Sequence, residues 1–168
     1  EDINAFLLTF AERHVIDPKH IYGAEMAIAL DWDCKEVTWD SPDAWLRVKL
    51  DEVSIYGVLA QITDYKTAFY APSEAELSKT SQGKIYALVF SKLNPYLTEF
   101  KVINNYIRWG VRREIKNKDK QPLTLNDLAE VETKLRGDTE RMNKKIERDG
   151  ADASKWPAVA CDNCGICT

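Results

Sequence analysis

Long apolar runs are missing from this chain. Of its 168 residues, 45% are apolar and 30% are charged, and no stretch approaches the roughly 20 consecutive apolar residues that a membrane-spanning helix needs. The pattern of a signal peptide is missing as well. We therefore expect one domain, residues 1–168, with enough apolar material for a substantial core, in the cytoplasm and without a membrane partner. Internal repeats and low-complexity segments are also absent from the sequence.

Cysteine is scarce, with four copies that are unevenly spaced. Cys161, Cys164 and Cys167 gather in the C-terminal tail, residues 151–168. Such usage does not make a disulfide framework and indicates metal chemistry in a reducing compartment. The C-x-x-C-x-x-C spacing is similar to the start of a bacterial ferredoxin motif, but the fourth cysteine of that motif is missing after Cys167. The alternatives are a zinc site or a tail that binds nothing, and Cys34 is interpreted as an ordinary thiol.

An excess of positive charge is missing too. The net charge of −4 does not by itself predict nucleic-acid binding, although basic residues can gather on one face of a protein. Two stretches, 112–120 and 134–145, are rich in lysine and arginine and could follow the phosphates of a nucleic acid. A solvated helix face is the commoner role of such stretches, so both interpretations stay open.

The chain otherwise alternates between helical and extended patterns, which predicts an α/β fold. Ser73-x-x-Glu76 and Thr124-x-x-Asp127 are typical of capping boxes at helix starts, and Gly150 offers a helix stop. The expected elements are helices over 2–14, about 74–93 and about 125–148, a strand over 23–30, a hairpin over 44–66, and a second hairpin with strands 99–106 and 111–115 joined near Trp109-Gly110.

The first expected hairpin carries the motif Asp64-Tyr65-Lys66. Alternate residues of a strand share a face, so Asp64 and Lys66 should lie side by side while Tyr65 points the other way. The preceding strand, residues 45–53, also alternates and has Asp51 on its polar face.

The relative position of the two aspartates depends on the turn between the strands. A tight turn centred on Tyr56-Gly57, where glycine accepts a positive φ, pairs Asp51 with Ile62 and makes Asp51 and Asp64 diagonal neighbours on one face. A loop one residue longer would flip one strand and separate them.

Two converging aspartates and a lysine suit metal-dependent cleavage of a phosphodiester. Mg²⁺ and Mn²⁺ prefer oxygen ligands, which makes Asp51 and Asp64 candidate metal ligands. Such an ion can activate the attacking water and stabilise charge on the phosphoryl group. Lys66 could orient that water or neutralise the transition state. The alternative is a surface hairpin with ordinary charges.

Three blocks of the sequence resemble the RecB-like branch of the PD-(D/E)XK nuclease superfamily, which includes exonucleases of recombination and CRISPR-associated relatives. Arg47-Val48-Lys49-Leu50-Asp51-Glu52-Val53 is similar to the family's Gly-Arg-Ile-Asp-Arg-Ile strand, Ile62-Thr63-Asp64-Tyr65-Lys66-Thr67 to its Asp-Tyr-Lys-Thr strand, and Gln82-Gly83-Lys84-Ile85-Tyr86 to its Gln-x-x-x-Tyr helix. A looser block, residues 23–28, is similar to the Val-Glu strand that precedes the hairpin. The cysteine tail falls where these proteins often carry iron–sulfur cysteines, so the resemblance covers nearly the whole chain.

The resemblance implies a PD-(D/E)XK restriction-endonuclease-like core, a central mixed β-sheet flanked by helices. It implies a Mg²⁺- or Mn²⁺-dependent deoxyribonuclease, an exonuclease of recombination, repair or phage DNA processing that acts on single-stranded DNA or duplex ends. The residues that it assigns are Asp51 and Asp64 as catalytic metal ligands with Glu25 as a further ligand, Lys66 as the catalytic lysine, Gln82 and Tyr86 as substrate-binding or bracing residues, and Cys161, Cys164 and Cys167 as ligands of a 4Fe-4S cluster.

Two of these residues have a plain structural alternative. Tyr86 belongs to an apolar stripe at helical spacing, with Ile85, Val89 and Phe90, and could be a core residue. Glu25 could be an ordinary polar residue of an edge strand.

The sequence also departs from the family. The family usually has a histidine in a helix before the Glu-containing strand, and neither His14 nor His20 lies in a convincing match. His14 ends an amphipathic pattern and is interpreted as a helix-terminal or partly packed residue. The family's cluster is completed by an N-terminal cysteine, whereas Cys34 lies elsewhere. Because the chain begins at Glu1, we expect missing upstream sequence. The alternative functions are a catalytically weak or inactive nuclease-fold module for DNA binding or assembly, and a metal-stabilised structural protein.

Overall fold

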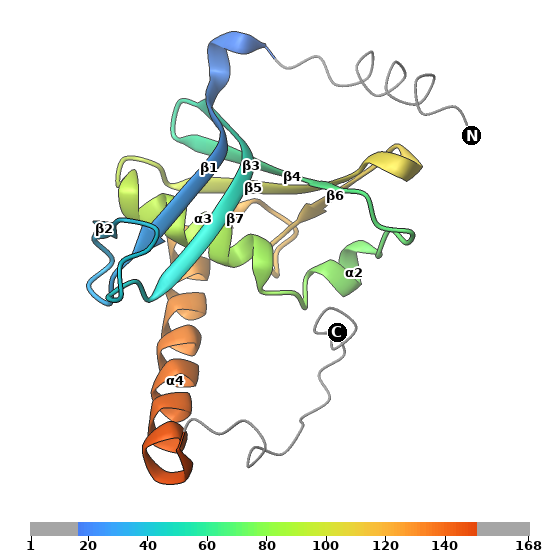
Figure 1. Ribbon diagram of the computed structural model, residues 1–168. Coiled ribbons are helices and arrows are strands. Elements are labelled where there is room, and N and C mark those ends of the chain that lie inside the picture. Colours follow the sequence, from blue (N-terminus) through green and yellow to red (C-terminus); the bar gives the residue numbers. More distant parts are fainter. Residues whose placement is uncertain (1–16, 151–168) are drawn as a thin grey trace. The chain divides into compact units, whose positions relative to one another are not determined.

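A seven-stranded mixed β-sheet forms the centre of the fold (Figure 1). The computed structural model describes residues 17–150; the predicted helix over 2–14, with His14, and the tail cysteines Cys161, Cys164 and Cys167 lie outside the described residues. A boundary between two compact units falls between Glu132 and Thr133. The strands are β1 Ile21–Leu30, β2 Glu36–Val37, β3 Leu46–Tyr56, β4 Leu59–Lys66, β5 Glu99–Tyr106, β6 Val111–Ile115 and β7 Leu123–Thr124, and the helices are α2 Glu74–Leu77, α3 Gln82–Leu93 and α4 Leu125–Asp149, with short 3₁₀ turns at Pro18–His20 (η1) and Ile107–Trp109 (η2).

The strand order is β2-β1-β3-β4-β5-β6, and β7 pairs with β5. Neighbouring strands are antiparallel except β4 and β5, which are parallel. A parallel pair needs a crossover connection, and α2 and α3 lie in this one. The α/β prediction is confirmed, as is the prediction of a mixed sheet with flanking helices. Sequence patterns missed the two-residue strands β2 and β7.

The hairpin of β3 and β4 has a different register from the predicted one. Tyr56 pairs with Leu59, so Gly57 and Val58 form the turn, and Val53 rather than Asp51 pairs with Ile62. The prediction of an Asp51–Ile62 pair is therefore wrong. Gly57 has a φ of 64°, as a two-residue hairpin turn with glycine at its first central position requires. The register differs by two residues, and because the side-chain period is also two, the predicted faces are kept.

The helix predicted over 74–93 is two helices. Its predicted start is confirmed, because Ser73 and Glu76 form a capping box. The helix stops after Leu77 and resumes at Gln82. In between, the hydroxyls of Ser78 and Thr80 each donate a 2.8 Å hydrogen bond to a backbone carbonyl. Such local bonds compete with continued helix formation.

Helix α3 packs against one face of the sheet, over β3 and β5 (Figure 1). Gly83 makes this approach close: a Cβ atom at that position would lie 2.7 Å from Val102 Cγ1 and closer still to Ile115 Cδ1. A core lies between α3 and the sheet, and its fully buried members include Val53, Ile62, Leu88, Val89, Phe90, Phe100 and Ile115.

The second hairpin and the last helix follow the sequence prediction. β5 and β6 are joined through η2 and Gly110, whose φ is 59°. The Oδ2 atom of Asp127 accepts hydrogen bonds from the nitrogen and hydroxyl of Thr124, at 2.8 and 2.7 Å, which starts α4. Gly150 ends it with a φ of 78°. No helix in residues 17–150 is both long and apolar enough to cross a membrane.

Candidate functional site

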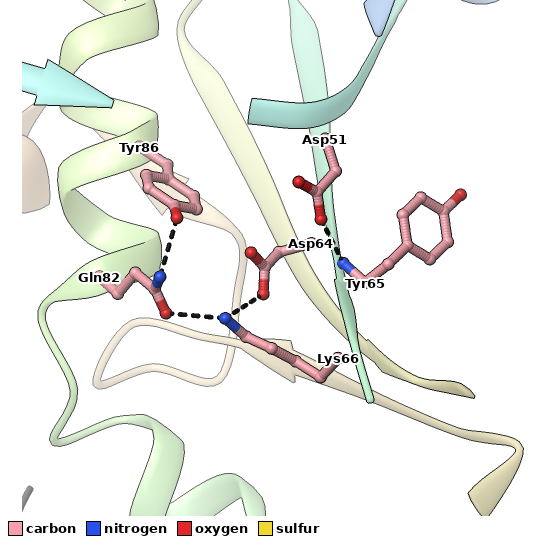
Figure 2. A network of polar contacts seen from close by, with 6 residues as sticks. All are labelled: Asp51, Asp64, Tyr65, Lys66, Gln82 and Tyr86. Carbon is pink, nitrogen blue, oxygen red and sulfur yellow. Dashed lines mark hydrogen bonds and ion pairs between the residues drawn. The ribbon is translucent and has the colours of Figure 1, made fainter. Parts of the chain in front are cut away.

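Asp51 and Asp64 lie level with each other on adjacent strands. The β3–β4 pairing reaches Glu52 and Thr63, and one further step along both strands brings Asp51 opposite Asp64. The Oδ2 atom of Asp51 accepts a 2.7 Å hydrogen bond from the backbone nitrogen of Tyr65 (Figure 2). This bond fixes the Asp51 carboxylate against β4, so the two carboxylates share the face that the sequence predicted.

Asp64 is paired with the lysine of its own strand. Asp64 Oδ2 lies 2.7 Å from Lys66 Nζ, as expected for alternate residues of a strand. Asp64 is only 6% exposed, and its Oδ2 atom has no partner in hydrogen-bond geometry within the described part of the chain. The ion pair is therefore the main contact of a buried carboxylate oxygen.

Lys66 continues the contacts from the sheet to α3. Lys66 Nζ donates a 3.1 Å hydrogen bond to Gln82 Oε1, and Gln82 Nε2 donates a 2.8 Å hydrogen bond to Tyr86 Oη (Figure 2). Gln82 and Tyr86 are one helical turn apart and share a face, as their spacing predicts. Tyr86 is half-buried, with its hydroxyl at the polar site. The close approach at Gly83 holds this first turn of α3 against Val102 of β5 and Ile115 of β6.

The charges of the site influence one another. Burial raises the pKa of the Asp64 carboxyl, and the nearby Asp51 carboxylate raises it further. The ammonium group of Lys66 lowers this pKa, but the net shift is upward. Burial also raises the pKa of Tyr86, and the charges of Asp64 and, more weakly, Asp51 act in the same direction. The two carboxylates and the phenol therefore lie within electrostatic reach of one another.

The donor set suits a hard divalent cation. The negative charges of Asp51 and Asp64 repel each other, and the ion pair with Lys66 balances only one of them. A cation between the two carboxylates would therefore stabilise both. Mg²⁺ is commonly held by one or two carboxylates, and water and phosphate oxygens complete its shell. Asp51 and Asp64 fit that pattern.

Glu25 occupies a neighbouring position on β1. Ala24 pairs with Glu52 and Met26 with Leu50, so the backbone of Glu25 lies level with Asp51. Glu25 is exposed, and its φ of 50° is unusual for a residue other than glycine. Across residues 17–150, no three or more His, Cys, Asp or Glu side chains form a metal-binding group. The structure thus brings Asp51 and Asp64 together but does not add Glu25 to them.

The other face of the hairpin holds a third carboxylate, Glu52, that the sequence patterns missed. Tyr65 points away from Asp64, as predicted, and its Oη donates a 2.5 Å hydrogen bond to Glu52 Oε2. Glu52 is 6% exposed. Burial, followed by this hydrogen bond, raises the pKa of Tyr65. An acidic residue between Leu50 and Ser54 on the buried face of β3 is the signal that could have identified Glu52.

Two polar residues on β5 and β6 extend the row of Asp51 and Asp64. Asp64 pairs with Asn104, and Asn104 pairs with Arg113. Paired residues project from the same face, so all three share a side of the sheet. The Nε atom of Arg113 is buried and finds no hydrogen-bond partner among residues 17–150. The sequence had indicated only a basic stretch over 112–120; strand alternation separates Arg113 from Arg112, which lies on the face of Tyr65.

The remaining predicted candidates lie away from this row. His20 Nδ1 is 3.2 Å from the carbonyl oxygen of Ile55, and its ring centroid is 4.4 Å from that of Tyr56. Cys34 Sγ donates to Glu132 Oε1 at 3.7 Å.

Comparisons with known proteins do not add to this description: no protein-family model matches the chain, and no curated protein matches it. The functional assignment therefore depends on the residues themselves.

Proposed function

We propose that the protein is a metal-dependent DNA nuclease of the PD-(D/E)XK type, an exonuclease that hydrolyses phosphodiester bonds in single strands or at duplex ends. The observation that supports this most is the position of Lys66 Nζ, 2.7 Å from Asp64 Oδ2 and 3.1 Å from Gln82 Oε1. These contacts join the Asp-Tyr-Lys strand to the Gln-x-x-x-Tyr helix, two motifs that resemble the same nuclease family.

Each residue has a role in this proposal. Asp51 and Asp64 hold Mg²⁺ or Mn²⁺, with Glu25 as a further ligand. The cation, when bound, supplies an activated water and offsets phosphoryl charge. Lys66 presents an ammonium group that orients the attacking water or stabilises charge on the phosphate. Gln82 and Tyr86 direct Lys66 and contact the substrate strand.

The test is hydrolysis of labelled single-stranded and duplex DNA with and without Mn²⁺. We expect Asp64→Ala and Lys66→Ala to lose about 100-fold or more of the metal-dependent rate. Lys92→Ala is the matched control, because Lys92 Nζ also pairs with a carboxylate, 2.5 Å from Glu132 Oε2, and its side chain is 32% exposed against 28% for Lys66. Full activity in Asp64→Ala or Lys66→Ala would overturn the proposal.

A second candidate is a nuclease-fold module that binds DNA or assembles with other proteins without hydrolysing DNA. Glu25 is exposed, and within residues 17–150 it forms no metal-binding group with the two aspartates, which favours this candidate. DNA binding without turnover at every Mn²⁺ concentration would select this candidate over the first.

A cofactor completes the proposal. Cys161, Cys164 and Cys167 would bind a 4Fe-4S cluster, with zinc as the alternative, since both metals take thiolate ligands. Visible absorption of the purified protein distinguishes them, because an iron–sulfur cluster is coloured and zinc is not.

A further inference from the structure

Two segments leave the sheet at the same edge, next to the candidate site. β4 and β5 are parallel, and their last paired residues are Lys66 and Tyr106. The chain then continues as residues 67–72 after β4 and as Ile107–Trp109 (η2) after β5 (Figure 1). Both segments therefore begin directly beside Lys66.

These segments expose aromatic rings. Phe69 is 79% exposed, Tyr70 62% and Trp109 53%. Arg108 connects the two segments, because its guanidinium carbon lies 4.3 Å from the centroid of the Phe69 ring. We call Phe69, Tyr70, Arg108 and Trp109 the aromatic platform.

The chemistry of the platform matches one kind of ligand. Nucleobases stack on aromatic side chains and on guanidinium planes, and an arginine also attracts the phosphates that link them. Stacking needs the flat face of a base to be accessible. In a duplex those faces are covered by neighbouring base pairs, whereas in a single strand they are free.

We infer that the aromatic platform binds the bases of single-stranded DNA and leads the strand to the phosphate site at Asp64 and Lys66. This inference rests on the proposed function for the direction of the strand. Phe69 lies three residues beyond Lys66 in sequence, so a base stacked on the platform belongs to a nucleotide close to the one at Lys66. The platform would thus give the protein a preference for single strands or frayed ends over internal duplex.

The experiment measures binding in the absence of divalent cations, so that hydrolysis does not contribute. Fluorescence anisotropy of a labelled oligothymidylate is recorded with the wild type, Phe69→Ala and Trp109→Ala. We expect each substitution to weaken binding about 5- to 100-fold, the range for loss of one base–aromatic stack. Tyr96→Ala is the matched control: Tyr96 is 55% exposed, but it lies between α3 and β5, at the other end of the parallel strands. It should bind as the wild type does.

Two further measurements distinguish base stacking from non-specific binding to the exposed aromatic residues. An abasic oligomer of the same length loses stacking on every ring of the platform, so it should bind the wild type at least as weakly as the normal oligomer binds Trp109→Ala. Trp109→Phe should keep most of the affinity, because a phenyl ring still stacks, while the quenching of tryptophan fluorescence on binding decreases. A blunt duplex should bind more weakly than the single strand.

The outcomes decide the inference independently of catalysis. Wild-type affinity in both Phe69→Ala and Trp109→Ala, or equal binding of abasic and normal oligomers, would overturn it and leave the platform as a surface for a protein partner. If the proposed hydrolysis fails, the wild type shows no turnover yet the platform variants still lose affinity. Lys66→Ala should lose turnover but keep the aromatic dependence of binding.

Discussion

Asp51 Oδ2 accepts a 2.7 Å hydrogen bond from the backbone nitrogen of Tyr65, so one candidate metal ligand is oriented by the backbone of the strand that carries the other. Tyr65 is itself fixed on the opposite face by its 2.5 Å hydrogen bond to Glu52. The position of the Asp51 carboxylate is therefore set by the sheet before any ligand binds.

Two substitutions can distinguish the role of the Asp51 charge from the role of its hydrogen bond with the Tyr65 N–H. Asn at position 51 still offers an oxygen to the Tyr65 N–H but carries no charge, whereas Ala removes both. We expect Asp51→Asn to abolish Mn²⁺-dependent hydrolysis with a small change in stability. Asp51→Ala should also lower the free energy of unfolding by about 1–3 kcal/mol, the cost of an unsatisfied donor. Urea unfolding and the DNA assay measure the two effects, and metal-dependent activity in Asp51→Asn would rule out this carboxylate as a ligand.

The raised pKa of Asp64 predicts that its ionised carboxylate lowers the free energy of unfolding at neutral pH. Burial raises this pKa, and Lys66 only partly offsets it. A carboxyl whose pKa is higher in the folded state than in the unfolded state stabilises the fold when it is protonated. This stabilisation is complete below the pKa of the unfolded state, about 4, and is lost as the pH rises through the pKa of the folded state. Asp64→Asn should therefore be more stable than the wild type at neutral pH, and the gain should vanish below about pH 4. Urea unfolding at several pH values tests this.

Metal binding should stabilise the wild type more than Asp64→Asn, the reverse of the order expected without metal. Mn²⁺ at 100 times its dissociation constant should stabilise the wild type by about 2.7 kcal/mol. Asp64→Asn should gain much less from Mn²⁺, because it has lost a charged ligand. Equal stabilisation of both proteins by Mn²⁺ would place the ion elsewhere.

The sequence was sufficient to place Asp64 and Lys66 on one face, because side-chain alternation is a local property of a strand. Asp51 shares that face because the observed register differs from the predicted one by two residues, an even number. It did not determine the register. A two-residue turn can hold glycine at either central position, and the choice is made by packing: the observed register pairs Val53 with Ile62, both completely buried.

Local sequence patterns could not predict that the helix over 74–93 divides into α2 and α3. They also could not predict that Asn104 and Arg113 lie in the same row as Asp64. The apolar stripe of α3 was readable, but the break before Gln82 depends on where the hydroxyls of Ser78 and Thr80 find acceptors. Asn104 and Arg113 join the row of Asp64 only because β5 lies beside β4, and alternation within a strand does not reveal its neighbour.

The close contact at Gly83 predicts a coupled loss of stability and activity. Alanine is a better helix former than glycine, but the added Cβ would overlap Val102 and Ile115 in the core. Overpacking of this kind costs about 1–3 kcal/mol. We expect Gly83→Ala to lower the free energy of unfolding and to slow hydrolysis, because Gln82 moves with the first turn of α3.

Gly137 provides the matched control for Gly83. It is also a helical glycine, and the nearest atom to an added Cβ is Arg141 Nη1 at 3.7 Å, an ordinary contact. Gly137→Ala should raise stability by about 0.5–1 kcal/mol and leave hydrolysis unchanged. If Gly83→Ala behaves like Gly137→Ala, the packing of α3 on the sheet is looser than the structure indicates.

Asp127, at the start of α4, is expected to contribute stability whose pH dependence has the opposite sign to that of Asp64. Partial burial raises the pKa of Asp127, but hydrogen bonds from Thr124 and Asn117 outweigh it and the net pKa is lowered. A carboxyl with a lower pKa in the folded state stabilises the fold above its unfolded pKa, about 4, and this contribution is lost as the pH falls through the folded value.

Asp127→Ala should therefore lower the free energy of unfolding by about 0.5–2 kcal/mol at neutral pH, the usual value of a helix cap, and by less in acid. Glu130→Ala, an exposed substitution in the next turn of the same helix, should change stability by less than about 0.5 kcal/mol. Urea unfolding of the two variants and the wild type across the acid range measures the difference. A loss in Asp127→Ala that is as large in acid as at neutral pH would mean that the ionised carboxylate does not cap α4, because hydrogen bonds to the charged carboxylate are stronger than those to the protonated acid.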